Sequence, residues 1–157
     1  MQCTVRKAEK KDVADILRLI KELAEYEKAP DEVKITVEEL EHDGFGPQAV
    51  YKAFVAEAEG KIVGMALYYV KYSTWKGKAI YLDDIVVNEA YRRYGVGTLL
   101  FNAVIKVCKE MGVRKMDWQV LDWNEPAINF YKKYNTVFSD EWLNGTLHEK
   151  QLKDIKI

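Results

Sequence analysis

The sequence has few of the residues that build disulfide or metal frameworks. Its two cysteines, Cys3 and Cys108, are far apart and form no C-x-x-C motif. Its two histidines, His42 and His148, stand alone without the spacing of metal ligands. We therefore expect reduced cysteines packed as small apolar residues in a cytoplasmic protein, and no bound metal.

Long apolar runs and a large net charge are also absent. No stretch of about 18 apolar residues is present that could span a membrane, and the polar segment 1–11 does not have the pattern of a secretory signal. The net charge of −1 provides no basic surface of the kind that nucleic-acid binders need. Neither a membrane nor a nucleic acid is expected as a partner, and the 157 residues suit a single domain over 1–157.

Hydrophobic periodicity along the chain alternates between helix and strand patterns. An amphipathic helix is expected from 13 to about 27, with Asp12 as its cap, and a shorter helix should follow the capping box Thr36-x-x-Glu39. Further helices are expected at 97–111, ended by Gly112, and from Asn124 to about 133. Strands are expected at 3–8, 49–58, 61–72, 80–87, 113–121, 136–141 and 146–155.

The connections between these elements predict how the strands pair. Glu59-Gly60 and Asn144-Gly145 are tight-turn signals, so the strands that flank them should form antiparallel hairpins. Strand 80–87, helix 97–111 and strand 113–121 form a βαβ unit, whose strands should be parallel. The expected fold is α/β, with a mixed, largely antiparallel sheet, helices on both faces and a central parallel βαβ unit.

Two adjacent carboxylates, Asp83 and Asp84, interrupt the apolar strand 80–87. Charges in a buried strand are costly unless they have a partner or a task. Because strand side chains alternate, we expect one carboxylate to face a site and the other to face the opposite side of the sheet. The Tyr-rich run that includes Tyr68, Tyr69 and Tyr72 is either cross-strand packing or an aromatic wall for a cation.

The loop that follows this strand contains Arg92-Arg93-Tyr94-Gly95-Val96-Gly97 and opens a helix. Small residues let a ligand approach the backbone, and the free N–H groups of a helix start attract anions. The spacing is not that of a P-loop, and Leu100 stands where a dinucleotide fingerprint needs glycine or alanine. By itself the pattern fits either a phosphate site or ordinary turn glycines.

A strand followed by R-x-x-G-x-G resembles the pyrophosphate loop of the GNAT (GCN5-related) N-acetyltransferases. Within that superfamily the chain resembles the diamine acetyltransferases, which acetylate spermidine, spermine or thialysine. Further matches, in the family's order, are DILRLIKELAEYEK (15–28), DGFG (43–46), YLDD (81–84) and WNEPAINFYKK (123–133). The last twenty or so residues match least.

The resemblance implies acetyl-CoA as the acetyl donor and assigns a site for it. The donor residues it implies are Ile85, Val86, Val87, Arg92, Arg93, Tyr94, Gly95, Val96, Gly97, Thr98 and Asn124. The loop amides would hold the pyrophosphate, and the pantetheine arm would lie along 85–87 like an added strand.

The resemblance also implies catalytic and acceptor residues. Tyr131, in Asn129-Phe130-Tyr131, matches the family's general acid for the leaving thiolate, although alone it is also typical of a packed helix-end tyrosine. Asp83 stands where the family usually has a glutamate that acts as base through water. The implied amine-binding residues are Tyr26, Glu27, Asp83, Asp84, Trp118, Gln119 and Glu141.

We therefore expect acetyl-CoA-dependent N-acetylation of a small amine, such as a polyamine, a diamine or a thialysine-like compound, by direct attack on the thioester. Two alternatives remain: an acetyltransferase for proteins or peptides, and a non-catalytic module that binds acyl-CoA. The family resemblance further implies a homodimer.

Overall fold

The structure, a computed structural model, describes residues 1–157. The chain falls into two compact units, Met1–Gln119 and Val120–Ile157. We describe each unit by itself. No helix in either unit combines the length and the apolar character needed to cross a membrane.

The first unit is built on a five-stranded sheet with the strand order β1-β2-β3-β4-β5. Its strands are β1 (Cys3–Lys7), β2 (Lys52–Ala58), β3 (Lys61–Ser73), β4 (Gly77–Val87) and β5 (Met116–Asp117). Neighbours from β1 to β4 are antiparallel, whereas β4 and β5 are parallel. The prediction of a mixed, largely antiparallel sheet with a parallel βαβ unit is confirmed.

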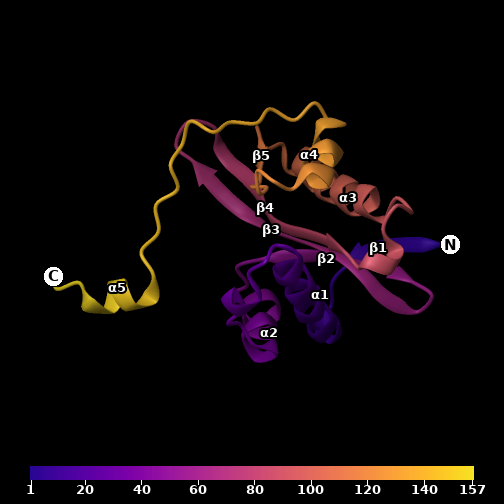
Figure 1. Cartoon of the computed structure of the whole chain (residues 1–157), viewed down its shortest axis with the longest axis horizontal. Coiled ribbons are helices and arrows are strands. Elements are labelled where there is room, and N and C mark those ends of the chain that lie inside the picture. The colour runs from indigo at the N-terminus through magenta and orange to yellow at the C-terminus, as the bar shows by residue number, and fades with distance from the viewer. The chain divides into compact units, whose positions relative to one another are not determined.

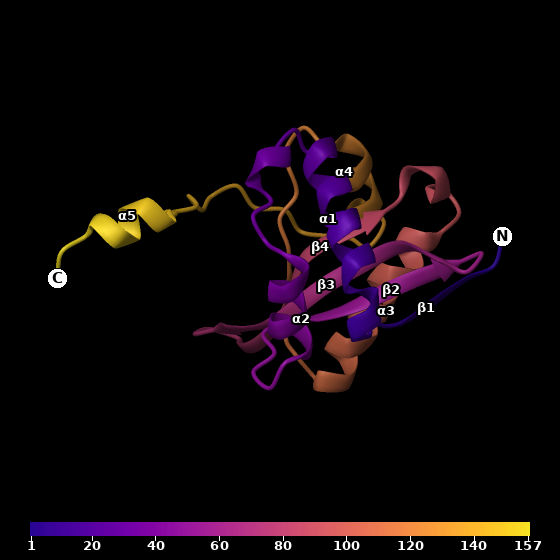
Figure 2. The ribbon, with the colours of Figure 1, turned by 90° about the horizontal axis from the view of Figure 1, so that it is seen from below.

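Helices cover both faces of this sheet. α1 (Val13–Tyr26) and α2 (Val37–Phe45) lie on one face, and α3 (Val96–Met111) lies on the other (Figure 1). The view from below shows α1 and α2 in front of the strands (Figure 2). Short 3-10 helices are η1 (Lys10–Asp12), η2 (Pro30–Glu32) and η3 (Glu89–Tyr91).

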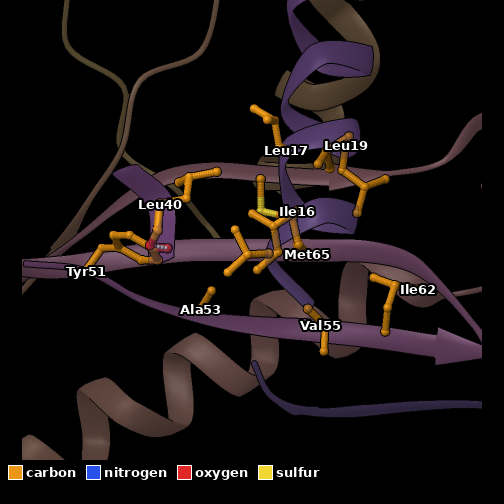
Figure 3. Packing of buried hydrophobic residues seen from close by; sticks show 11 residues of the cluster. Ile16, Leu17, Leu19, Leu40, Tyr51, Ala53, Val55, Ile62 and Met65 are labelled. Carbon is orange, nitrogen blue, oxygen red and sulfur yellow. Dashed lines mark hydrogen bonds between the residues drawn. The ribbon is translucent and has the colours of Figure 1, made fainter. Parts of the chain in front are cut away.

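The core between α1, α2 and the sheet follows from the apolar stripe of α1. Ile16 and Leu19 are completely buried against the strands, where they pack near Val55 and Met65 (Figure 3). The hydroxyl of Tyr51 donates a hydrogen bond to the backbone carbonyl of Leu40 within this cluster. Each fully buried aliphatic side chain of α1 contributes about 1.5–3 kcal/mol of burial free energy. This burial holds α1 at a fixed place on the sheet.

Helix ends match the predicted signals with one exception. Thr36 and Glu39 form the expected reciprocal capping box of α2, and Gly112 ends α3 with a φ of 65°. Asp12 precedes α1 but does not cap it, so that prediction was wrong. Its carboxylate instead binds the Arg6 guanidinium at 2.7 and 3.0 Å.

The turn between β2 and β3 is the predicted tight hairpin. Glu59 and Gly60 both have positive φ, 53° and 73°. Two successive positive φ values match the twist of the flanking strands.

The second unit contains α4 (Glu125–Lys132) and α5 (Glu149–Asp154). The predicted cap of α4 is confirmed, because Asn124 Oδ1 accepts a hydrogen bond from the Ala127 amide. The predicted strands at 136–141 and 146–155, and the hairpin turn at Asn144-Gly145, were wrong. Residues 136–148 have no helix or strand, and α5 occupies part of the second range.

The failed strand predictions have a common physical cause. Alternating apolar residues make a segment suitable for a strand, but a strand forms only where a neighbour supplies its hydrogen bonds. Strand β5 is likewise limited to two residues of the predicted 113–121, because its pairing with β4 covers only Ile80 and Tyr81.

Candidate active site

A β-bulge in β4 places the two adjacent carboxylates on the same face of the sheet. On β3, the consecutive residues Leu67 and Tyr68 pair with Asp84 and Leu82, so Asp83 is the extra residue of the bulge. A bulge interrupts the alternation of side chains. The prediction that Asp83 and Asp84 face opposite sides was therefore wrong.

Neighbouring contacts identify the face as the one covered by α1. Asp84 pairs with Leu67, which packs on the core beneath α1. The Tyr69 hydroxyl, two residues further along β3, donates a hydrogen bond to Asp83 Oδ1 at 3.4 Å. The rings of Tyr69 and Tyr81 are stacked with their centroids 5.3 Å apart. Asp83, Asp84 and a tyrosine pair thus share one surface.

Glu27, at the C-terminal end of α1, adds a third carboxylate to this group. Burial, together with the nearby charges of Asp83 and Glu27, raises the pKa of Asp84 to about 7. Burial also raises the pKa of Asp83, although its hydrogen bond from Tyr69 acts in the other direction. The group therefore attracts cations, and Asp84 can exchange a proton near neutral pH.

Arg92 connects the loop after β4 to the end of α1. Its guanidinium carbon lies 5.3 Å from the centroid of the Tyr26 ring, and its Nε donates to the Val87 carbonyl at 3.1 Å. Arg92 therefore positions the loop and Tyr26 relative to β4.

The loop opens α3 with backbone donors facing outward from the helix start. Gly95 is the N-cap residue with a φ of 80°, and the first α-helical hydrogen bond runs from the Leu99 amide to the Gly95 carbonyl. The amides of residues 96–98 precede that bond and are available to an anion. Arg93, in the same loop, also has a positive φ of 69°.

The backbone of β4 has an open side next to this helix start. Residues Ile85, Val86 and Val87 pair with β3 on one side. On the other side, β5 pairs no further than Tyr81. An extended molecule could therefore lie against residues 85–87 and end near the amides of α3.

The structure does not bring all of the predicted amine residues to the carboxylates. Trp118 packs edge-to-face on Phe101 of α3, with centroids 5.4 Å apart, and thus lies on the opposite face. Gln119 is exposed. A surface cavity of about 650 Å³ beside the start of α1, lined in part by Arg6, Arg18 and Glu57, contains none of the predicted site residues.

The remaining predicted residues belong to the second unit. Tyr131 lies in α4, where its ring contacts Phe130 with centroids 5.4 Å apart and its carbonyl accepts a hydrogen bond from Thr136 Oγ1 at 2.7 Å. Asn124 precedes α4 as its cap. Glu141 is exposed in the segment without helix or strand.

Sequence reasoning missed Lys71, Lys115 and Asp117, which form ion pairs next to Tyr81. The signal was available for Lys71, which stands two residues after Tyr69 on the same strand and so shares its face.

Comparison with known proteins identifies the family of this chain. The model of the acetyltransferase (GNAT) family matches residues 13–135. The chain belongs to the GNAT acetyltransferase family. As a GNAT member it is an acetyl-transferring enzyme, and the alternative of a non-catalytic module is set aside.

Relatives of this GNAT enzyme include named amine acetyltransferases. It is 46% identical over 136 residues to the thialysine N-epsilon-acetyltransferase of Bos taurus, covering 82% of this chain and 80% of that protein. It is 37% identical over 134 residues to a spermidine/spermine N(1)-acetyltransferase-like protein of Homo sapiens, covering 81% of this chain and 19% of that protein. The resemblance to the diamine and thialysine acetyltransferases is confirmed.

The fold agrees with solved GNAT structures. An aminoglycoside acetyltransferase from a soil metagenome superimposes with a TM-score of 0.76 at 20% identity, covering 93% of this chain and 95% of that one. This likeness concerns the fold alone.

Proposed function

We propose that the enzyme transfers the acetyl group of acetyl-CoA to a small cationic amine, such as a polyamine, a diamine or a thialysine-like compound. The observation that carries this proposal is the bulge in β4, which gathers Asp83 and Asp84 beside Glu27 and the Tyr69–Tyr81 pair. Carboxylates and aromatic faces together suit an ammonium group. The named substrates of the relatives, thialysine and spermidine or spermine, are amines of this kind.

The donor would bind along β4 and the start of α3. The amides of residues 96–98 and the loop 92–95 would hold the pyrophosphate, since the helix start provides donors and a favourable dipole. The open side of residues 85–87 would receive the pantetheine arm as a strand-like partner. Asn124 is proposed as a further donor contact on the strength of the family motif.

Asp84 is the better candidate for accepting the proton of the amine. An amine with a pKa near 10 loses its proton to an ordinary carboxylate at a cost of about 8 kcal/mol, because the two values differ by about six units. With the pKa of Asp84 at about 7, the cost falls to about 4 kcal/mol. Asp83, which the sequence predicted as the base, is more exposed and suits the role of holding the cation.

Acetyl transfer proceeds once the amine has lost its proton. Its nitrogen attacks the thioester carbonyl, the carbon–sulfur bond breaks, and the departing thiolate takes a proton. Tyr131 is proposed as the donor of that proton, because a phenol near pKa 10 is well matched to an alkyl thiolate.

Release of CoA thiol in the presence of acetyl-CoA and a panel of amines tests the proposal. We expect turnover with diamines, polyamines or amino acids that carry a side-chain amine, and little with a lysine-containing peptide. Asp84→Asn should lower kcat/KM most at neutral pH. The decrease relative to the wild-type enzyme should be smaller at pH 9–10, where free amine already exists. Turnover with peptides alone, or activity unaffected by replacement of both aspartates, would contradict the proposal.

We also propose that the enzyme is a homodimer. Large apolar side chains of the second unit are exposed, with Val137 at 92% and Leu143 at 98%. Large apolar side chains that are this exposed are typical of a surface that another chain covers.

A further inference from the structure

A cluster of three charges lies next to the tyrosine pair. Lys71 Nζ lies 3.2 Å from Asp117 Oδ2, and Lys115 Nζ lies 3.0 Å from the same oxygen. Lys71 Nζ is also 5.5 Å from the centroid of the Tyr81 ring. Because two ammonium groups share one carboxylate, the cluster carries a net positive charge.

This cluster and the carboxylates lie at two ends of the same surface. Contacts run without a break from Asp83 to Tyr69, from Tyr69 to Tyr81, and from Tyr81 to Lys71. Lys71 pairs with Ala79, four residues before Asp83, so the two ends are separated by at most about 13 Å of strand. The surface is therefore dipolar over the length of a small molecule.

We propose that Lys71 and Lys115 select acceptors that carry a carboxylate away from the reacting amine, in preference to linear diamines and polyamines. This inference rests on the proposed function, since it assumes that the reacting amine is held by Asp83 and Asp84. The preferred acceptors would then be amino acids whose side chain ends in an amine.

Electrostatics gives the reason for this preference. The carboxylate of such an amino acid would meet two ammonium groups, of which only one is neutralised by Asp117. The distal ammonium of a diamine would meet the same net positive charge and be repelled. Lys71 is partly exposed, at 42% of its side chain, so solvent screens the interaction and the selection by each lysine is modest.

Matched substrates isolate the carboxylate as the only difference. L-lysine differs from cadaverine, and L-ornithine from putrescine, by that group alone. We expect the wild-type enzyme to have a higher kcat/KM for each amino acid than for its decarboxylated partner. Lys71→Met should lower kcat/KM for the amino acids about fivefold, the equivalent of 1 kcal/mol, mainly through KM, and leave the diamines unchanged or improved.

Two further variants separate charge from structure. Lys71→Arg keeps the positive charge and should retain the preference for amino acids. Lys78→Met is the matched control, because Lys78 is an exposed lysine on the same hairpin whose position shares the other face with Ile80 and Leu82. It should leave all four substrates unaffected.

The outcomes distinguish this inference from the proposed function. If none of the four amines nor spermidine is acetylated, the proposed function fails. If amines are acetylated but the diamines are preferred, or if Lys71→Met affects both members of each pair equally, the proposed function stands and the selection by Lys71 is overturned.

Discussion

At the scale of single residues, adjacent carboxylates have acquired different environments. Asp83 is exposed and bound by the Tyr69 hydroxyl, whereas Asp84 is more buried and feels the charges of Asp83 and Glu27. The difference arises because the bulge turns both side chains to one face but leaves only Asp84 beneath its neighbours. In the proposed mechanism the more exposed Asp83 therefore binds the cation, and the more buried Asp84 accepts the proton.

Asp84→Asn should stabilise the protein at alkaline pH. The folded state raises the pKa of Asp84 from the ordinary 3.8 to about 7, so it binds the proton more tightly than the unfolded chain does. The wild-type free energy of unfolding therefore falls as pH rises from about 4 to about 7, by up to about 4 kcal/mol. Urea unfolding should show the variant more stable at pH 8 and equal at pH 4.

The matched control for that measurement is Asp15→Asn, which removes a half-exposed carboxylate of α1 that pairs with Arg18. It should change the free energy of unfolding by less than about 1 kcal/mol at pH 8. If Asp84→Asn were destabilising at pH 8, Asp84 would hold a favourable charge interaction in the folded state.

Tyr131→Phe should lower kcat by about 100-fold, because it keeps the ring and removes the proton that the thiolate would take. The dissociation constant of acetyl-CoA, measured by calorimetry, should change little. Tyr134→Phe, on the residue one turn later, serves as the control and should keep kcat. A Tyr131→Phe variant with near wild-type kcat would show that water protonates the thiolate.

At the scale of elements, the loop between β4 and α3 connects the two halves of the proposed site. Arg92 holds its beginning on Val87 and Tyr26, and Gly95 ends it in a left-handed conformation from which α3 starts. The direction of the first-turn amides therefore depends on the backbone of Gly95.

Gly95→Val should weaken CoA binding by about tenfold or more. A β-carbon at Gly95 would have no atom within 4 Å, so the effect would come from the backbone. A φ of 80° is strained for a β-branched residue by about 1–2 kcal/mol, and relief of that strain would turn the amides away. Calorimetric titration with CoA measures the change.

Gly60→Val is the control for general backbone strain, since Gly60 has a φ of 73° and equally open surroundings in the hairpin turn. It should lower stability by a similar amount and leave CoA affinity unchanged. If Gly95→Val bound CoA with undiminished affinity, the proposal that this loop binds the pyrophosphate would be contradicted.

At the scale of the whole molecule, the two units differ in how they bury their apolar residues. The first unit has a core in which Ile16, Val55 and Met65 are fully enclosed. The second exposes Phe138, Trp142 and Leu143 in a segment without helix or strand. The prediction of one domain over 1–157 stays a prediction.

Sedimentation of the wild-type protein should show a dimer, and the double change Val137→Asp and Leu143→Asp should yield a monomer. Both side chains are almost wholly exposed, so the added charges would cost little in a monomer and much in an apolar interface. Val50→Asp, which alters an exposed apolar residue of the first unit, should leave the dimer intact. A wild-type monomer at micromolar concentration would contradict the proposal.

Local chemistry decided which elements of the chain could be predicted from its sequence. The α1 stripe, the Thr36–Glu39 capping box and the Glu59-Gly60 turn each depend on residues within one or two turns of chain, so their patterns were sufficient. The family motifs likewise identified an acetyltransferase, because each motif is a short run of residues that are adjacent in the sequence.

Tertiary structure decided what depends on partners distant in sequence. The bulge at Asp83 appears only in the register between β3 and β4, and it reversed the expected orientation of one carboxylate. The strands expected after residue 135 failed for the same reason, since a strand needs a hydrogen-bonded neighbour that its own sequence does not supply. The raised pKa of Asp84 likewise depends on tertiary structure, because burial is its main cause and the charge of Glu27, which the packing of α1 brings close, adds to it.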